Sequence, residues 1–131
     1  FSRIMLGFGS RVLAYDVSKN ESLSNAGVSY VPLAEIFTKA DIISLHCPLN
    51  ESTRYIINDQ SVQQMKKGVM LINTSRGALI DTRSVIQALK SGTIGSLGID
   101  VYEQEEKIFF RDLSEKIIKD DIITRLSSFP N

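Results

Sequence analysis

Two short polar segments of this chain carry residue types that could bind a small carboxylic acid and support acid–base chemistry. Residues 73–77 read Asn-Thr-Ser-Arg-Gly, and the guanidinium of Arg76 matches a carboxylate through paired hydrogen bonds that lysine cannot make. Asp100 begins an acidic segment that continues to Glu103 and Glu105. A carboxylate beside a histidine stabilises the imidazolium and raises its pKa. Both segments also have a plainer interpretation, as solvated loops.

Two further positions suit the binding of a dinucleotide. Asp16 follows the apolar run RVLAY, where an acidic residue would accept hydrogen bonds from ribose hydroxyls and repel the extra phosphate of NADP. A loop aspartate is an equally good interpretation. His46-Cys47-Pro48 closes another apolar run, and Cys47 with Pro48 could form an apolar wall beside adenine. We expect His46 to be structural and Cys47 to be an unreactive thiol, since no cationic neighbour would lower its pKa.

The Gly7-Phe8-Gly9 segment resembles part of a phosphate-binding loop but stands in the wrong context. Such a loop must open a helix, where free backbone N–H groups face the pyrophosphate. Here the chain runs on into Arg11–Tyr15, which has the pattern of a strand. We therefore interpret Gly7 as a helix stop and Gly9 as part of a turn.

The elements that must position these residues alternate between strand and helix. Four apolar or β-branched runs predict strands: Arg11–Tyr15, Asp41–His46, Val69–Asn73 and Leu97–Val101. The second and third are apolar almost throughout, which is typical of strands covered on both faces. Helices are predicted at the start (ending at Gly7) and over Leu33–Lys39, Asn58–Lys67, Asp81–Ser91, Ser114–Lys119 and Asp121–Ser128. This order predicts an α/β fold with a doubly wound parallel sheet, which binds ligands at the carboxyl ends of its strands.

The composition excludes several classes of protein. The chain has 131 residues, about the size of one domain, and its 15 basic and 15 acidic side chains cancel, so it offers no electrostatic reason to bind nucleic acid or an anionic membrane. No apolar run is long enough to span a bilayer. Cys47 is the only cysteine, which excludes an internal disulfide and a multi-cysteine metal site. We expect a cytoplasmic protein without a bound metal.

Taken together, these segments resemble the NAD-binding domain of the D-isomer-specific 2-hydroxyacid dehydrogenase family. The matching stretches, RVLAYD, ADIISLHCPL, MKKGVMLINTSRGALID and IGSLGIDVYEQE, cover nearly the whole chain in order. The most specific feature is INTSRG with the aspartate of LGIDVYE placed 24 residues after the arginine. Residues 109–131 resemble an insertion typical of fermentative D-lactate dehydrogenases.

The resemblance implies a Rossmann-like fold, NAD as the cofactor, and a small 2-keto or 2-hydroxy acid as the substrate, with pyruvate and D-lactate expected. Arg76 matches the arginine that grips the substrate carboxylate, and Glu105 the glutamate that pairs with the catalytic histidine, with Glu103 as the second choice. Asp16 matches the ribose-binding acid. The other positions implied to contact NAD are Cys47, Pro48, Thr53, Thr74, Ser75, Arg76 and Asp100.

Three parts of the family pattern are expected to lie outside these residues. They are the glycine loop with its strand, before Phe1; the catalytic histidine, after Asn131; and the substrate domain. The sheet should thus be incomplete at both ends, and the 131 residues alone should lack activity, whereas the intact protein should be a homodimer. The alternatives are a dehydrogenase for another D-2-hydroxy acid (branched-chain, glycerate or phosphoglycerate type), an NAD-sensing corepressor, or a non-functional remnant.

Overall fold

The computed structural model describes residues 1–103, 126, 129 and 130, and within them helices and parallel strands alternate. Across this part of the chain no helix is both long and apolar enough to cross a membrane. The elements run in the order α1 (Ser2–Gly7), β1 (Leu13–Ala14), α2 (Glu21–Asn25), β2 (Ser29–Tyr30), α3 (Leu33–Lys39), β3 (Ile42–Leu45), α4 (Asp59–Gln64), β4 (Val69–Asn73), the 3₁₀-helix η1 (Gly77–Leu79), α5 (Thr82–Ser91) and β5 (Ile94–Ile99).

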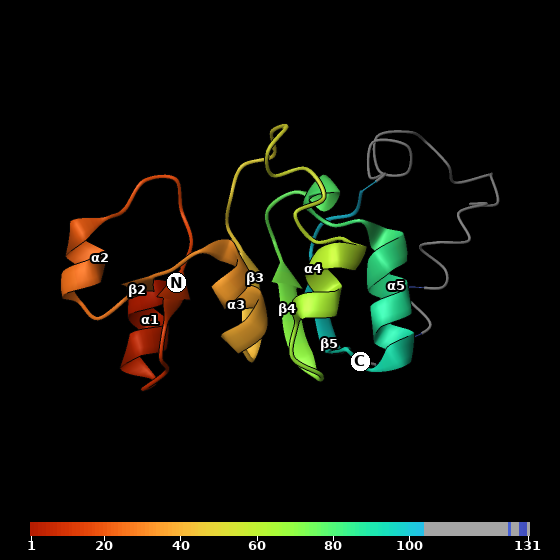
Figure 1. Ribbon diagram of the computed structural model, residues 1–131, viewed down its shortest axis with the longest axis horizontal. Coiled ribbons are helices and arrows are strands. Elements are labelled where there is room, and N and C mark those ends of the chain that lie inside the picture. Colours follow the sequence, from red (N-terminus) through yellow and green to blue (C-terminus); the bar gives the residue numbers. More distant parts are fainter. Residues whose placement is uncertain (104–125, 127–128, 131) are drawn as a thin grey trace.

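The five strands form two parallel sheets, in the orders β1-β2 and β3-β4-β5. Figure 1 shows β1, β2, α1 and α2 toward one end of the long axis and the three-stranded sheet with α3, α4 and α5 toward the other. The predicted α/β class with parallel strands is confirmed. The single sheet is not seen in the described residues, because β1 pairs with β2 and not with β3. Neither β2 nor α2 was predicted from the sequence, because both are too short to show a periodic pattern of hydrophobic residues.

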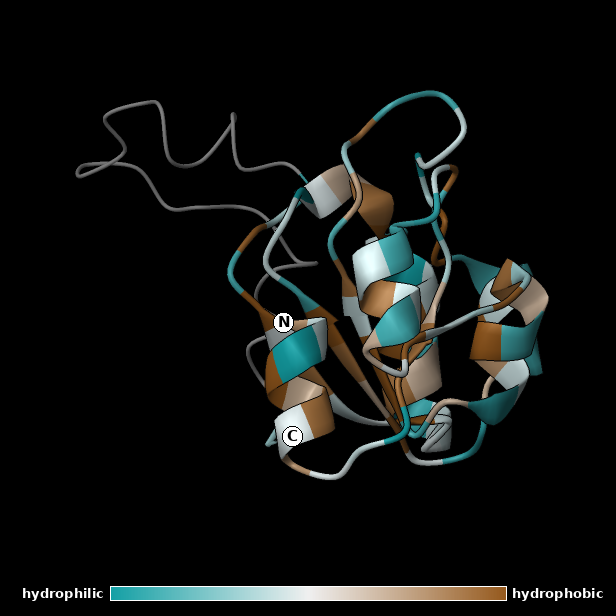
Figure 2. Ribbon diagram, turned by 90° about the vertical axis from the view of Figure 1, so that its left-hand side faces the viewer, coloured by the Kyte–Doolittle hydropathy of each residue, from teal (hydrophilic) through white to brown (hydrophobic). Residues whose placement is uncertain are grey.

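The main core lies between the three-stranded sheet and helices α3, α4 and α5. Helix α4 packs between α3 and α5, and α5 also packs on β5. Figure 2 shows hydrophobic residues gathered on the strands at the centre of the molecule. The cluster includes Phe37 of α3, Val62 of α4 and Leu89 of α5. Its most deeply buried apolar side chains are Ile57, Leu71, Leu79, Ile94, Val69 and Val85.

The opposite face of this sheet is more open than predicted. Ile42 and Met70 are register partners on β3 and β4, and they are 55% and 38% exposed. Their neighbours Ile43 and Leu71 point to the covered face, because side chains alternate along a strand. The expectation of strands covered on both faces is therefore wrong for the described residues, whose helices α3 to α5 share one side.

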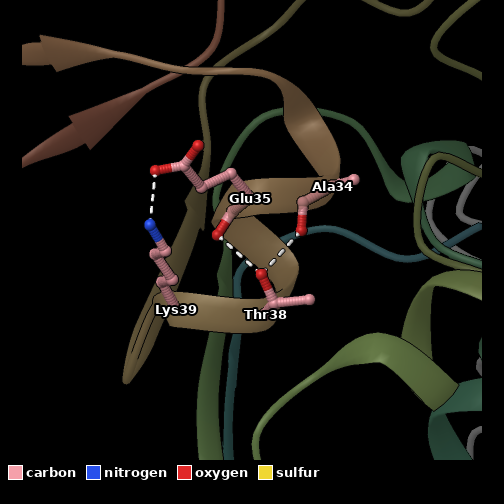
Figure 3. Close-up of polar contacts among 4 residues, drawn as sticks. All are labelled: Ala34, Glu35, Thr38 and Lys39. Atoms are coloured by element: carbon pink, nitrogen blue, oxygen red, sulfur yellow. Dashed lines mark hydrogen bonds and ion pairs between the residues drawn. The ribbon is translucent and has the colours of Figure 1, made fainter.

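Local side chains explain where three of the helices begin and end. Helix α3 follows Pro32 and matches its predicted bounds; the Lys39 ammonium pairs with Glu35 at 2.8 Å and the Thr38 hydroxyl bonds the preceding turn (Figure 3). Helix α5 begins after the Asp81 cap and ends at Gly92, in the left-handed conformation. Helix α4 is predicted over Asn58–Lys67; in the structure Asn58 is its N-cap, and the helix ends at Gln64, three residues before the predicted end, because the chain becomes extended at Met65.

Strand β5 begins at Ile94, three residues before the predicted start. Ile94 is fully buried and pairs with Val69. The next residue, Gly95, lies so close to Gly68 that an added Cβ would meet its carbonyl oxygen at 2.8 Å. Small residues at Gly95 and Ser96 hid the strand from a hydrophobicity pattern. The predicted helices over 114–119 and 121–128 lie outside the described residues, apart from Leu126, which is helical.

Candidate active site

The carboxyl ends of β3, β4 and β5 meet at one edge of the sheet. Leu45, Asn73 and Ile99 end these strands and are in register. Two hydrogen bonds hold the following loops together: the Ser75 hydroxyl donates to the Leu45 carbonyl at 2.9 Å, and the Asp100 amide donates to the Asn73 carbonyl at 3.1 Å. The polar segments singled out in the sequence therefore start side by side, at the edge where a parallel α/β sheet binds ligands.

The turn after β4 is shaped by the side chain of Asn73, which is fully buried. Its amide nitrogen donates to the Arg76 carbonyl at 2.9 Å, and its amide oxygen accepts from the Ser75 backbone at 3.1 Å. A buried amide with both ends bonded fixes the backbone around it. The conformation of the Arg76 backbone is thus set by a residue of the strand itself.

The Arg76 side chain is exposed at this edge. One guanidinium nitrogen donates to the Ser75 carbonyl at 2.8 Å, which orients the group. Among the described residues no carboxylate pairs with it, since the ion pairs found there are Lys39–Glu35 and Lys66–Asp41. A guanidinium held at one corner keeps its remaining donors for an incoming carboxylate or another anion.

The loop after β5 lies directly on the loop after β4. Gly77 is buried, and a Cβ at this position would overlap the backbone of Tyr102 and Glu103. Only glycine permits such an approach. The residue that follows Arg76 is therefore in backbone contact with the acidic segment that begins at Asp100.

The Glu103 carboxylate is bound by two hydroxyl groups. One oxygen accepts from the Tyr55 hydroxyl, and the other accepts from the Thr82 hydroxyl at 3.0 Å. Thr82 is the first residue of α5, where the free N–H groups of a helix attract negative charge. Hydrogen bonding to this carboxylate raises the pKa of Tyr55, followed by smaller contributions from burial and from the Glu103 charge. The tyrosine therefore stays protonated and remains the donor.

Tyr55 has an unusual backbone, with φ of 51°, and within the described residues it is the only non-glycine residue with positive φ. For such a residue this conformation costs of order 1–3 kcal/mol and requires support from its surroundings. Support comes from the Tyr55 amide, which donates to the Ala78 carbonyl at 2.9 Å, and from Asn58, whose side chain donates to the Tyr55 carbonyl at 2.8 Å. The loop that carries Tyr55 is thus bound to the segment that follows Gly77.

The segment after β3 is bonded mainly within itself. His46 is exposed, and its Nε2 lies 2.9 Å from the Ser44 hydroxyl, as expected of a structural histidine. Desolvation lowers the pKa of His46, so the ring is neutral near pH 7. The Thr53 hydroxyl donates to the Pro48 carbonyl at 2.6 Å, which closes the turn. Cys47 is half-buried, and burial raises the pKa of its thiol, with the Asp16 charge adding to the rise.

Asp16 follows β1 in the other sheet, yet its charge reaches Cys47. The side chain is exposed, and one carboxylate oxygen accepts from the Ser18 amide at 3.1 Å. The second oxygen has no partner among the described residues and can accept from a ribose hydroxyl. The helix end at Gly7 and the positive φ of Gly9 (76°) confirm that this glycine pair closes a helix instead of opening one.

The structure places the predicted site residues in three groups. Arg76, Ser75, Thr74 and Asp100 lie together at the edge formed by β4 and β5, while Cys47, Pro48 and Thr53 belong to the adjacent loop after β3. Asp16 reaches this loop from the other sheet. Glu105 lies outside the described residues, whereas Glu103, the second choice, lies within them. Sequence analysis missed Tyr55 and Thr82, because neither a positive φ nor a cross-loop hydrogen bond has a signature in a single sequence.

The side chains at this edge suit the parts of a dinucleotide. The carboxylates of Asp16 and Asp100 can accept from ribose hydroxyls, and the Thr74 hydroxyl is exposed and has no partner among the described residues. Cys47 supplies a half-buried apolar surface beside them. No helix in the described residues opens with a glycine loop for the pyrophosphate. The described residues therefore fit the nucleoside ends of NAD and leave its phosphates without a loop.

Comparison with known proteins gives a consistent result. Residues 1–125 match the family described as D-isomer specific 2-hydroxyacid dehydrogenase, NAD binding domain. The chain is 50% identical over 129 residues to a D-lactate dehydrogenase of Escherichia coli, covering 98% of this chain and 39% of that protein.

Two solved structures share the fold. A structure described as the pyruvate reductase of Chlamydomonas reinhardtii has a TM-score of 0.91 and 47% identity, covering 98% of this chain and 40% of the other. A D-lactate dehydrogenase from Aquifex aeolicus, complexed with NAD and lactic acid, has a TM-score of 0.88 and 37% identity, covering 96% and 38%. The chain thus spans about two fifths of the length of these relatives.

Proposed function

We propose that this chain, which belongs to the D-isomer specific 2-hydroxyacid dehydrogenase family and matches its NAD-binding domain, is part of an enzyme. The proposed enzyme reversibly reduces pyruvate to D-lactate. The observation that carries the proposal is the exposed Arg76 side chain, which follows the carboxyl end of β4 and has no carboxylate partner among the described residues. The similarity to proteins named D-lactate dehydrogenase and pyruvate reductase supports this choice of substrate.

The proposed reaction adds one hydride and one proton to the keto acid, which together amount to two electrons and two protons. NADH, when bound, supplies a hydride to the carbonyl carbon, and a proton goes to the carbonyl oxygen, which gives the 2-hydroxy acid. Arg76 binds the substrate carboxylate through paired hydrogen bonds and thereby orients the carbonyl. Asp16 and Asp100 accept from ribose hydroxyls, while Cys47, Pro48, Thr53, Thr74 and Ser75 line the cofactor side.

We assign the proton donor to a histidine of the complete protein that pairs with Glu105, which keeps the imidazole protonated. His46, the only histidine of this chain, is a poor candidate because its Nε2 is bonded to Ser44 and desolvation lowers its pKa. We further propose that the complete protein is a cytoplasmic homodimer and that the 131 residues alone do not turn over substrate.

The test is to assay the full-length protein with NADH and with NADPH on pyruvate, hydroxypyruvate, glyoxylate and a branched-chain 2-keto acid, and to determine the chirality of the product. We expect pyruvate and NADH to give the highest kcat/KM and the product to be D-lactate. A higher kcat/KM for another keto acid would contradict the choice of pyruvate. Tight NADH binding without turnover of any keto acid would overturn the enzymatic proposal in favour of an NAD-sensing role.

A further inference from the structure

We propose that Tyr55, Thr82 and Glu103, here called the Glu103 cluster, are positioning residues that hold the loop after β5 against the Arg76 turn. The inference rests on the proposed function in one respect, since it takes Arg76 as the substrate-binding arginine. None of the three need touch the substrate. The cluster instead determines how accurately two loops from different strands present their side chains at the same edge.

Glu103 connects three separate segments of the chain. Its carboxylate accepts from the hydroxyl of Tyr55, in the loop between β3 and α4, and from the hydroxyl of Thr82 at the start of α5. The Thr82 amide lies 3.5 Å from the same oxygen. Hydrogen bonds to an ionised carboxylate are roughly twice as strong as neutral ones. One side chain of the β5 loop is thus fixed to elements that come before and after the Arg76 turn.

A direct backbone contact lies beside Arg76. Gly77 packs on the Tyr102–Glu103 backbone so closely that no Cβ could be accommodated. Movement of the Glu103 loop must therefore displace Gly77, and with it the peptide that joins Gly77 to Arg76. Among the residues that the structure describes, the Arg76 guanidinium has the Ser75 carbonyl as its one hydrogen-bond partner, so its position depends on this backbone.

Tyr55, whose hydroxyl donates to Glu103, is held in a backbone conformation of high energy. The positive φ of Tyr55 is supported by hydrogen bonds to Ala78 and Asn58, and Arg54 covers its ring at 4.9 Å from the centroid. Strained residues cluster where a precise geometry is needed. Glu105, the proposed partner of the catalytic histidine, is two residues beyond Glu103 in the sequence.

The experiment measures steady-state kinetics of the full-length enzyme with Tyr55→Phe and Glu103→Ala. Small displacements of catalytic groups can cost up to about a hundredfold. We expect kcat/KM for pyruvate to fall about tenfold in both variants, with KM for NADH within about twofold of wild type. Thr82→Val should behave like them, and Thr82→Ser, which keeps the hydroxyl, should restore kcat/KM. Hydrogen exchange of the segments 76–82 and 100–103 should be faster in Tyr55→Phe.

Tyr30→Phe is the matched control, because Tyr30 lies on β2 and its hydroxyl accepts a single hydrogen bond from the Asn20 amide at 3.1 Å. It should leave both kcat/KM and the exchange of those two segments unchanged. The proposal is overturned if Tyr55→Phe and Glu103→Ala lower the melting temperature while the folded enzyme keeps its wild-type kcat/KM. A wild-type protein without keto-acid reduction would instead refute the proposed function, and the exchange measurement would still test the cluster.

Discussion

Residues 33–103 and residues 1–31 both combine helices with parallel strands, yet only residues 33–103 have a continuous apolar core. All its strands pair with β4, and Leu71 and Ile94 are fully buried. In residues 1–31 only Val12 and Val28 are buried, neither belongs to the main cluster, and each strand has two residues. Arg76 and Asp100 therefore follow strands that are anchored in a buried apolar core, whereas Asp16 follows a two-residue strand with few buried side chains around it. Precise sites need rigid supporting elements.

The greatest loss of activity should come from residues 33–103, at Arg76, the proposed carboxylate-binding arginine. Arg76→Lys keeps the charge but loses the planar pair of donors, so we expect kcat/KM for pyruvate to fall about a hundredfold, equivalent to about 2.7 kcal/mol. Steady-state kinetics on the full-length enzyme provides the measurement, with Arg83→Lys, an exposed arginine of α5, as the control. A loss smaller than about threefold would remove Arg76 from the proposed role.

The second prediction compares the packing of the two segments by making the same valine-to-alanine change in each. Val69→Ala removes a side chain that is 1% exposed in the main cluster, and Val28→Ala removes one that is 4% exposed outside it. Two lost methyl-sized groups account for about 1.6 kcal/mol, and a rigid surrounding adds a cavity term. We expect the unfolding free energy to fall by about 2.5 kcal/mol for Val69→Ala and by about 1.6 kcal/mol for Val28→Ala, where the surroundings add no cavity term.

Urea unfolding of both variants tests this expectation, with the slope of the transition checked for equality. Equal losses would mean that the segment 1–31 is packed as tightly as the rest, and the comparison would then fail. A larger loss for Val28→Ala would reverse it.

More of the secondary structure could be predicted from the sequence in residues 33–103 than in residues 1–31. In residues 33–103 the predicted helix Leu33–Lys39, the predicted strand Val69–Asn73 and the predicted helix Asp81–Ser91, which is α5 with its N-cap, are confirmed, because each has a strong local signal. In residues 1–31 the end of α1 was predicted and the predicted strand Arg11–Tyr15 contains the shorter β1, whereas α2 and β2 were not predicted. Strands of two residues have too few side chains to show alternation, and their pairing is decided by tertiary contacts.

The candidate site divides in another way. Arg76 and Asp100 were predictable because residues that follow apolar strands collect at one sheet edge. The support beneath them was not, since the Asn73 side chain, the Tyr55 conformation and the bonds of Glu103 join residues that are distant along the chain or depend on backbone angles. A sequence pattern indicates which groups meet, whereas the contacts that fix their geometry require the coordinates.

A smaller change in activity is expected from residues 1–31, at Asp16, the proposed ribose-binding residue. Asp16→Asn removes the negative charge that would repel the extra phosphate of NADP, so we expect the preference of kcat/KM for NADH over NADPH to fall about tenfold. Asp59→Asn, which removes an exposed charge at the start of α4, is the matched control. An unchanged preference in Asp16→Asn would show that Asp16 does not face the ribose, and would leave β1 without a role in the site.

The smallest effect on stability is expected at an exposed ion pair in residues 33–103, where Lys66 Nζ lies 2.8 Å from an Asp41 oxygen. Hydrogen bonding and charge from Lys66 lower the pKa of Asp41 below its usual 3.8. The folded protein thus binds this proton less readily than the unfolded chain, so the stabilisation is present above pH 3.8 and is lost as the pH falls through the folded-state value. Asp41→Asn should be slightly less stable than wild type at pH 7 and equal to it in strong acid. In residues 1–31 the Arg3–Ser22 contact has no titrating acceptor, so Ser22→Ala should cause a change independent of pH across that range. Urea unfolding at both pH values measures the two differences, and a pH-dependent difference in Ser22→Ala, or none in Asp41→Asn, would contradict this assignment.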